Sequence, residues 1–334
     1  MHRAKYAWWQ VLGSQAVQDV LERLERAWER FFAKQGRPPR FKKVKRYKSF
    51  TLKQTAGWKL LTYNQNVPRG KGKYRRARGT VALGGTVYKF VQHRPLFGIV
   101  KTVTVKRDSC GGLWVCFSVV EQVALPEGQA DLSHIGGFDF GLPTFLTDHE
   151  GKRWMHPEFF RHLLLRLRTL NRAVSRKPLD SHNRARARWL LARTHLRMAD
   201  KRRDFHFKLA HALCDAFDVL VFEDLNLDGM KRLWGRKVSD LGFGKFLAIV
   251  QHVAALRGKV VVQIGRYERT TQQCSTCRTR VRLTLKQREL VCPTPGCGTV
   301  LDRDHNAALN IRRAGASALA GRGIASPDSS GSPV

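Results

Sequence analysis

Three carboxylates occupy positions where a charge is costly. Asp139 lies within the apolar segment Gly-Phe-Asp-Phe-Gly, Glu223 ends the run Val-Leu-Val-Phe-Glu, and Asp304 begins Asp-His-Asn-Ala-Ala-Leu-Asn. Burying a carboxylate is unfavourable unless it is paired or binds a cation. One such acid is commonly a satisfied structural group, but three in one chain predict catalytic residues that hold divalent cations. Two Mg²⁺ ions held by these acids could activate water and stabilise the leaving oxygen in phosphodiester hydrolysis.

Four cysteines have the spacing of a zinc site. Cys274 and Cys277 form one pair, and Cys292 and Cys297 form a second pair with four intervening residues. Two close thiolate pairs on facing turns complete the tetrahedral sulfur site that Zn²⁺ prefers. The apolar runs at 281–285 and 289–291 predict hairpin strands between the pairs. We expect one structural zinc ion here, with free thiols or a redox pair as the alternatives.

The charge of the chain predicts a polyanionic partner. Its 334 residues include 61 Lys and Arg against 26 Asp and Glu, which gives a formal net charge of +35. Such self-repulsion is poorly tolerated in a folded protein unless a polyanion neutralises it, and nucleic acid is the obvious candidate. Between Arg30 and Arg107 the chain has 22 Lys or Arg and no acidic residue. The predicted nucleic-acid contacts are Arg40, Lys42, Lys43, Lys45, Arg46, Arg75, Arg76 and Arg78.

The periodicity of apolar residues changes along the chain. Helical spacing predicts a helix from Ser14 to Phe32, and alternation predicts a small basic β region over residues 50–122. From Ile135 onward, strand-like runs alternate with long helical stretches, which indicates an α/β domain. The Gly/Ser/Pro-rich end of the chain, from about Ala316, is expected to be disordered.

Two further features bear on location. No run of about 18 apolar residues occurs, and no apolar stretch follows the first basic residues, so we expect neither a membrane span nor a secretory signal. Cysteine usage suits a reducing compartment, with Cys110, Cys116 and Cys214 as ordinary buried thiols. A cytoplasmic protein is therefore predicted.

In their order along the chain, these motifs resemble those of the OrfB/TnpB family encoded by insertion sequences, which is related to compact type V CRISPR effector nucleases. The resemblance rests on Gly-Phe-Asp139-Phe-Gly, Phe-Glu223-Asp-Leu-Asn, the cysteine pairs and Asp-Arg-Asp304-His-Asn-Ala-Ala-Leu-Asn-Ile. It runs from Ser14 to Ile311. It implies an α/β RNase H-like (RuvC) core with an inserted zinc ribbon, preceded by a helical segment and a small β-barrel-like wedge domain.

The resemblance also implies a domain order and an activity. The expected order is a recognition-lobe remnant and basic segment (1–49), a wedge-like β domain (50–122), a linker (123–134), a RuvC-like domain with motifs I and II (135–269), a zinc ribbon that binds target nucleic acid (270–300), a motif III helix (301–315) and a disordered tail (316–334). Asp139, Glu223 and Asp304 match the family's Mg²⁺-binding triad. The implied activity is RNA-guided DNA cleavage for a transposable element, with guide RNA and target DNA as partners.

Three readings stay open. The sequence departs from the family at its start, where a strand and several helices that usually precede the Ser14–Phe32 helix are missing. That difference puts stable guide binding and recognition of the target-adjacent motif in question. The alternatives to a guided nuclease are a transposase or resolvase that uses the same acids for strand transfer, and a guide-dependent DNA-binding protein without cleavage.

Overall fold

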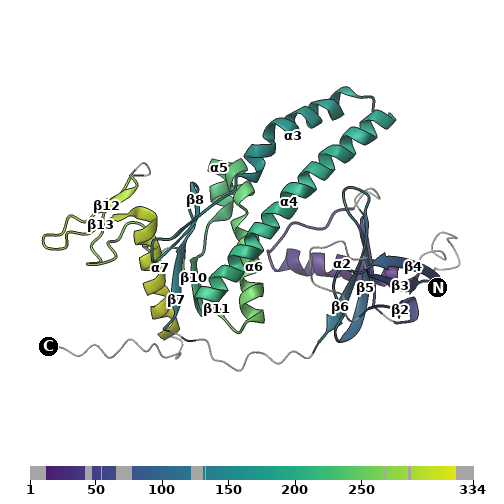
Figure 1. The fold of residues 1–334 in the computed structure, drawn as a ribbon, viewed down its shortest axis with the longest axis horizontal. Helices are drawn as coiled ribbons and strands as arrows, with labels where there is room; N and C mark the ends of the chain where they lie inside the picture. Colours follow the sequence, from purple (N-terminus) through teal and green to yellow (C-terminus); the bar gives the residue numbers. More distant parts are fainter. Residues whose placement is uncertain are drawn as a thin grey trace. The chain divides into compact units, whose positions relative to one another are not determined.

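The computed structural model describes residues 13–41, 47–53, 55–64, 77–121, 131, 133–266, 268–284 and 287–320. Within the chain, Met1–Val123 and Ala124–Val334 form separate units, called unit 1 and unit 2 below (Figure 1). Some predicted nucleic-acid contacts lie outside the described residues: Lys42, Lys43, Lys45, Arg46, Arg75 and Arg76.

Unit 1 contains a helix and two antiparallel sheets. Its elements are α2 (Ser14–Phe32), β1 (Ser49–Leu52), η3 (Thr55–Gly57), β2 (Trp58–Thr62), β3 (Arg78–Leu83), β4 (Thr86–Val91), β5 (Ile99–Arg107) and β6 (Leu113–Val120). The sheets have the orders β1-β5-β6 and β2-β3-β4. Leu52, Trp58 and Val103, which come from both sheets, are buried together. The predicted β region is therefore two small sheets that share one apolar core.

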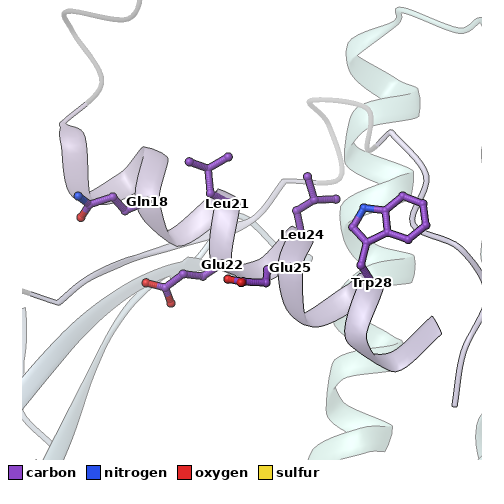
Figure 2. A pocket seen from close by; sticks show the side chains of 6 residues that line it. All are labelled: Gln18, Leu21, Glu22, Leu24, Glu25 and Trp28. Carbon is purple, nitrogen blue, oxygen red and sulfur yellow. The ribbon is translucent and has the colours of Figure 1, made fainter. Parts of the chain in front are cut away.

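Helix α2 is joined to the β region of unit 1 through its polar side. Asp19 is buried, accepts a hydrogen bond from the backbone N–H of Thr51 (3.0 Å) and pairs with Arg23 (2.7 Å). The apolar side chains whose spacing predicted the helix lie on the opposite side and are exposed (Figure 2): Leu21, Leu24 and Trp28. Charge and hydrogen bonding, rather than burial of the apolar stripe, hold the helix in place.

Unit 2 is built on a mixed five-stranded sheet. Its strands are β7 (Ile135–Asp139), β8 (Thr144–Asp148), β9 (Arg153–Met155), β10 (Val219–Glu223) and β11 (Val260–Ile264), in the order β11-β10-β7-β8-β9. The pairs β7–β8 and β8–β9 are antiparallel, whereas β10 runs parallel to both β7 and β11. Strands buried on both faces carry nearly continuous apolar runs, which is why β7 and β10 could be found in the sequence.

Helices cover both faces of this sheet. The described helices of unit 2 are α3 (Phe159–Arg176), α4 (His182–Ala216), α5 (Leu227–Leu241), α6 (Phe243–Leu256) and α7 (Arg303–Ala320), and all of these except α3 contribute to the cores on the sheet. On one face, Leu220 and Phe222 pack with residues of α4 and α6. On the other face, Val219 and Val221 pack with Ile311 of α7. The alternation of side chains along β10 thus gives the sheet two cores, and the predicted α/β architecture is observed.

Some details of the sequence prediction were wrong. Helix α7 continues through Ala320, beyond the predicted end at residue 315, and Leu319 is buried against the sheet. The predicted disorder therefore does not begin at residue 316; residues 321–334 lie outside the described part of the chain. Of the three cysteines expected to be buried, Cys214 is buried, Cys110 is partly buried and Cys116 is exposed. Among the described helices, none has the length and apolar character needed to span a membrane.

His206 makes the stability of unit 2 depend on pH. This side chain of α4 is 1% exposed, donates from Nε2 to the carbonyl oxygen of Leu241 (3.0 Å) and stacks on Phe145. Burial lowers the pKa of His206 to about 4. The folded protein thus keeps this ring neutral while the unfolded chain, with an ordinary pKa of about 6.5, takes up a proton. The contribution of the neutral His206 ring to the stability of the folded state is therefore fully present above about pH 6.5 and is lost as the pH falls towards 4.

We therefore predict that His206→Phe reduces the pH dependence of folding. Between pH 7.5 and pH 5.0, the free energy of unfolding should fall by on the order of 1–2 kcal/mol more in the parent protein than in the variant. Urea denaturation at the two pH values measures this difference. An identical pH dependence in both proteins would contradict the assignment.

Candidate metal-binding active site

Asp139 and Glu223 end two neighbouring parallel strands. In the pairing of β7 with β10, Phe138 lies opposite Phe222, so the acids that follow them continue in the same register. Adjacent strands lie about 4.8 Å apart, and parallel strands present their carboxyl ends at one edge of a sheet. The sheet therefore places two predicted catalytic acids side by side, although they are far apart in the sequence.

Helix α7 brings the third acid to this edge. Asp304 stands in the first turn of α7, and the backbone N–H groups of Asp304 and His305 donate to the side chain of Asp302 (3.0 and 3.2 Å). The helix can lie directly on β7 because a side chain at Gly137 would overlap the carbonyl oxygen of Ala308. The glycine before Phe138 in the first motif thus has a physical role: it permits the close approach that positions Asp304.

The three acids influence one another electrostatically. Burial, followed by the charges of Asp304 and Glu223, raises the pKa of Asp139 well above its ordinary value. Burial also raises the pKa of Glu223, against a hydrogen bond that Thr270 Oγ1 donates to Glu223 Oε2 (3.2 Å). A cluster in which ionised carboxylates repel one another gains stability when a cation is bound among them.

The donor set fits a hard divalent cation. Carboxylate oxygens are the ligands that Mg²⁺ prefers. In the described part of the chain, two groups have ligand atoms that all lie within 4.8 Å of one another, namely the four cysteines and Asp131, His134 and Asp218. The three acids at the sheet edge are not such a group, so they share one edge without meeting at one point. Shared ion binding would require the carboxylates to turn towards one another.

The four predicted zinc ligands do converge. Their sulfur atoms all lie within 4.8 Å of one another, with Sγ–Sγ distances of 3.8 Å for Cys274–Cys297 and 3.3 Å for Cys277–Cys292. A tetrahedral site with Zn–S bonds of about 2.3 Å has sulfurs about 3.8 Å apart. None of these four cysteines forms a disulfide bond. A hydrogen bond with Thr279 is the main cause that lowers the pKa of Cys277 to about 5, which favours the thiolate that a metal binds.

The hairpin of the cysteine region differs from the prediction. Strand β12 (Glu289–Val291) pairs with β13 (Val300–Asp302), not with the apolar run that begins at Val281. Val281 instead packs in a small apolar cluster with Leu290 and the cysteines. The second cysteine pair therefore lies in the turn of the observed hairpin, and the first pair reaches it from a separate loop.

Two asparagines connect the cysteine region to the acid cluster. Asn306 accepts from the backbone N–H of Ser275 (2.8 Å) and donates to the carbonyl of Gln273 (2.8 Å). Asn310, one turn later on α7, donates to the carbonyl of Thr270 (2.8 Å), the residue whose hydroxyl contacts Glu223. Both asparagines are buried. Sequence reasoning did not single them out, although amides at i and i+4 in an apolar helix were a usable signal.

The predicted nucleic-acid contacts remain a prediction. Arg40 and Arg78 are exposed and have no ion-pair partner among the described residues, as expected for side chains available to phosphate groups. They lie in unit 1, and the other six predicted contacts fall outside the described ranges.

The fold and the site together define an α/β protein with an acid cluster at a sheet edge and an adjoining four-cysteine cluster. Two family models match the chain: a probable transposase model, OrfB_IS605, over residues 118–233, and a Cas12f1-like TNB domain model over residues 243–311. A Streptomyces pristinaespiralis protein named as an RNA-guided DNA endonuclease is 32% identical over 319 residues, which cover 94% of this chain and 74% of the relative. The chain belongs to the OrfB/TnpB family.

Further relatives agree with this assignment. The Escherichia coli K12 protein InsQ, also named as an RNA-guided DNA endonuclease, is 27% identical over 325 residues, which cover 92% of this chain and 76% of that protein. Among solved structures, Cas12f1 in complex with sgRNA and target DNA superposes with a TM-score of 0.53 at 15% identity, over 89% of this chain and 71% of that chain. At this identity the likeness concerns the fold.

Proposed function

We propose that the protein is an RNA-guided, divalent-metal-dependent DNA endonuclease of a transposable element. The observation that carries the proposal is the placement of Asp139, Glu223 and Asp304 along one sheet edge in a chain with a net charge of +35. The relatives named as RNA-guided DNA endonucleases support the same activity. In this reading unit 2 contains an RNase H-like (RuvC) core over 135–269 and 301–315, and the β region of unit 1 is the wedge domain.

The three acids would hold two Mg²⁺ ions. Bound magnesium supplies charge neutralisation at the reacting phosphate and lowers the pKa of water. The remaining work falls to the chain itself. Thr270 holds one oxygen of Glu223, Asn310 holds the backbone of Thr270, and Asp302 caps the helix that carries Asp304. These contacts orient two of the three carboxylates before substrate arrives, which is the main contribution that a protein makes to such a site.

The four cysteines would bind one structural Zn²⁺. In the proposed arrangement, residues 270–300 form a zinc ribbon that binds target nucleic acid between the second and third acid motifs. A site closed by four thiolates has no open position for substrate, so its role is to stabilise the fold of a small region. Its contacts with α7 through Asn306 make the ribbon a support for the acid cluster as well.

The excess of cations would be neutralised by a guide RNA and a DNA target. In RNA-guided recognition, base pairing with the guide reads the target sequence, while the protein supplies positive charge and shape. A second candidate, strand transfer by the same acids, is favoured by the description of the matching OrfB_IS605 model as a probable transposase. Assays that separate strand joining from simple cleavage distinguish the two.

Guidance predicts that the protein is purified with RNA. Protein expressed together with its flanking DNA should retain a discrete transcript from the end of the element, and the complex should cut DNA that matches the variable end of that RNA. Sequencing of the bound RNA, followed by cleavage of matched and mismatched duplexes, measures both. Folded protein that is consistently free of RNA and cuts matched and mismatched DNA alike would refute guidance and leave an unguided nuclease.

A further inference from the structure

A helical hairpin in unit 2 extends beyond the sheet. Helices α3 and α4 pack against each other, and Leu167, Ala187 and Thr194 are buried along them. Helix α4 has 35 residues and is about 52 Å long, but its contribution to the core on the sheet comes from Phe205 onward. Its first half and α3 therefore project from the sheet as an arm (Figure 1).

The arm carries many cations that no acidic group balances. Exposed arginines follow one side of α3 at helical spacing, at positions 168, 172 and 176. On α4, Arg186, Arg193 and Arg197 are also exposed, and none of these six arginines has an ion-pair partner among the described residues. Unpaired, exposed arginines repel one another, so this surface favours a bound polyanion.

One side of α4 combines charge with an aromatic ring. Arg186, Trp189, Arg193 and Arg197 stand at i, i+3, i+7 and i+11, and at 100° per residue they fall within a sector of about 80°. Trp189 is 41% exposed, and the guanidinium carbon of Arg193 lies 5.0 Å from the centroid of its ring. The arginine restrains the indole, so that an exposed aromatic surface is held between positive charges.

We propose that this stripe is a binding site for a single-stranded nucleic acid, with Trp189 stacking on an unpaired base and the three arginines contacting the phosphate backbone. An aromatic ring among cations is the combination that holds single strands. A duplex offers phosphates but no free base face, so the tryptophan selects the unpaired form. The site lies on the α3–α4 arm and is distinct from the acid cluster. The inference rests on the proposed function in that a guided nuclease must hold single-stranded segments.

The test compares variants of the full chain freed of nucleic acid and assayed without Mg²⁺. Anisotropy with labelled single-stranded RNA, single-stranded DNA and duplex DNA of equal length gives the affinities. Trp189→Ala should weaken single-strand binding roughly 5- to 150-fold and leave duplex binding nearly unchanged. Arg193→Gln/Arg197→Gln should lower the salt-dependence slope for single strands by about 1.4, because two phosphate contacts are lost.

A charge-matched control lies on the same helix. Arg203→Gln/Lys208→Gln also removes two charges from exposed positions of α4, but these side chains are paired with Asp200 and Asp204. This control should keep the parent affinity and slope. An equal loss in the control, or an equal loss of duplex binding in Trp189→Ala, would overturn the proposal. A larger loss with RNA than with DNA supports it with the guide as occupant, and the reverse supports it with a DNA strand as occupant.

The outcome separates this inference from the proposed function. Binding is measured without Mg²⁺ and so does not depend on cleavage. A protein that binds single strands through α4 but never cuts DNA would refute the proposed nuclease function and support the binding site on α4. If the protein cuts DNA under RNA guidance but Trp189→Ala binds single strands as tightly as the parent, the binding site on α4 is refuted and the proposed nuclease function stands.

Discussion

Asp139→Asn is expected to abolish DNA cleavage while leaving nucleic-acid binding nearly unchanged. Asparagine keeps the size of the side chain but removes a charge at the point where β7, β10 and α7 meet. Removing a single preorganised group that stabilises charge in a transition state costs roughly 10²–10³-fold in rate, and a metal ligand should cost at least as much. Cleavage rates at saturating guide and target, measured beside binding affinity, separate loss of chemistry from loss of binding.

Although Asp139→Asn should abolish cleavage, it should make the protein without cations more stable. Burial and the charges of Asp304 and Glu223 disfavour the ionised form of Asp139, so the parent protein without cations carries an electrostatic cost that Asp139→Asn removes. When Mg²⁺ is bound, the parent should instead be the more stable of the two proteins. Mg²⁺ at 100 times its dissociation constant should stabilise the parent by about 2.7 kcal/mol and the variant much less. Thermal unfolding with and without Mg²⁺ measures both effects.

Asp215→Asn provides the control for Asp139→Asn. Asp215 is an exposed carboxylate near the end of α4 that pairs with Arg257, away from the three acids. Its replacement should leave both cleavage and the response to Mg²⁺ at parent levels. Unimpaired cleavage by Asp139→Asn would rule out this metal site, and an unchanged Mg²⁺ response would show that the cation binds elsewhere.

The second large effect concerns zinc. Cys274→Ser should reduce the zinc content from about one ion per chain to near zero and make residues 270–300 sensitive to protease. The apolar cluster of this region is small, with Val281 and Leu290 as its buried members besides two cysteines. Zinc binding is worth on the order of 10–16 kcal/mol in comparable small domains, far more than two apolar side chains supply. Metal analysis and limited proteolysis measure the two losses.

Loss of the ribbon should also reduce cleavage. The backbone of Ser275, next to Cys274, donates to Asn306 of α7, and the same asparagine holds Gln273. When the loop unfolds, α7 loses these contacts and Asp304 loses part of its support. Cys116→Ser is the matched control, because Cys116 is an exposed thiol on β6 of unit 1. One zinc per chain that persists in Cys274→Ser would refute the assignment of the ligand.

Local patterns were sufficient to identify the residues that carry the chemistry. A strand such as β10, buried on both faces, has to be apolar throughout, so a single acid at its end stands out. Close cysteine pairs are equally local, because the chain between the members of a pair is too short to separate them widely. These signals depend on residues a few positions apart, and the structure brings all four cysteines together.

Such local patterns failed where the outcome depended on which other part of the chain an element packs against. The apolar spacing of α2 predicted the helix but not the exposure of Leu21 and Leu24, since periodicity reveals a face without revealing what covers it. The small residues from Ala316 onward suggested disorder, yet Ala318 and Leu319 pack against the sheet and extend α7. In both cases tertiary contact, which no short window contains, decided the outcome.

The sequence by itself determined which side chains can bind metal and phosphate, because residue type and short spacing are local properties. Only the tertiary structure decided where these side chains lie relative to one another. Parallel pairing of β7 with β10 sets Asp139 beside Glu223, and the missing side chain at Gly137 lets α7 approach closely enough to place Asp304 at the same edge. Contacts between segments so distant along the chain arise from the packing of whole elements, and that packing is a property of the folded molecule.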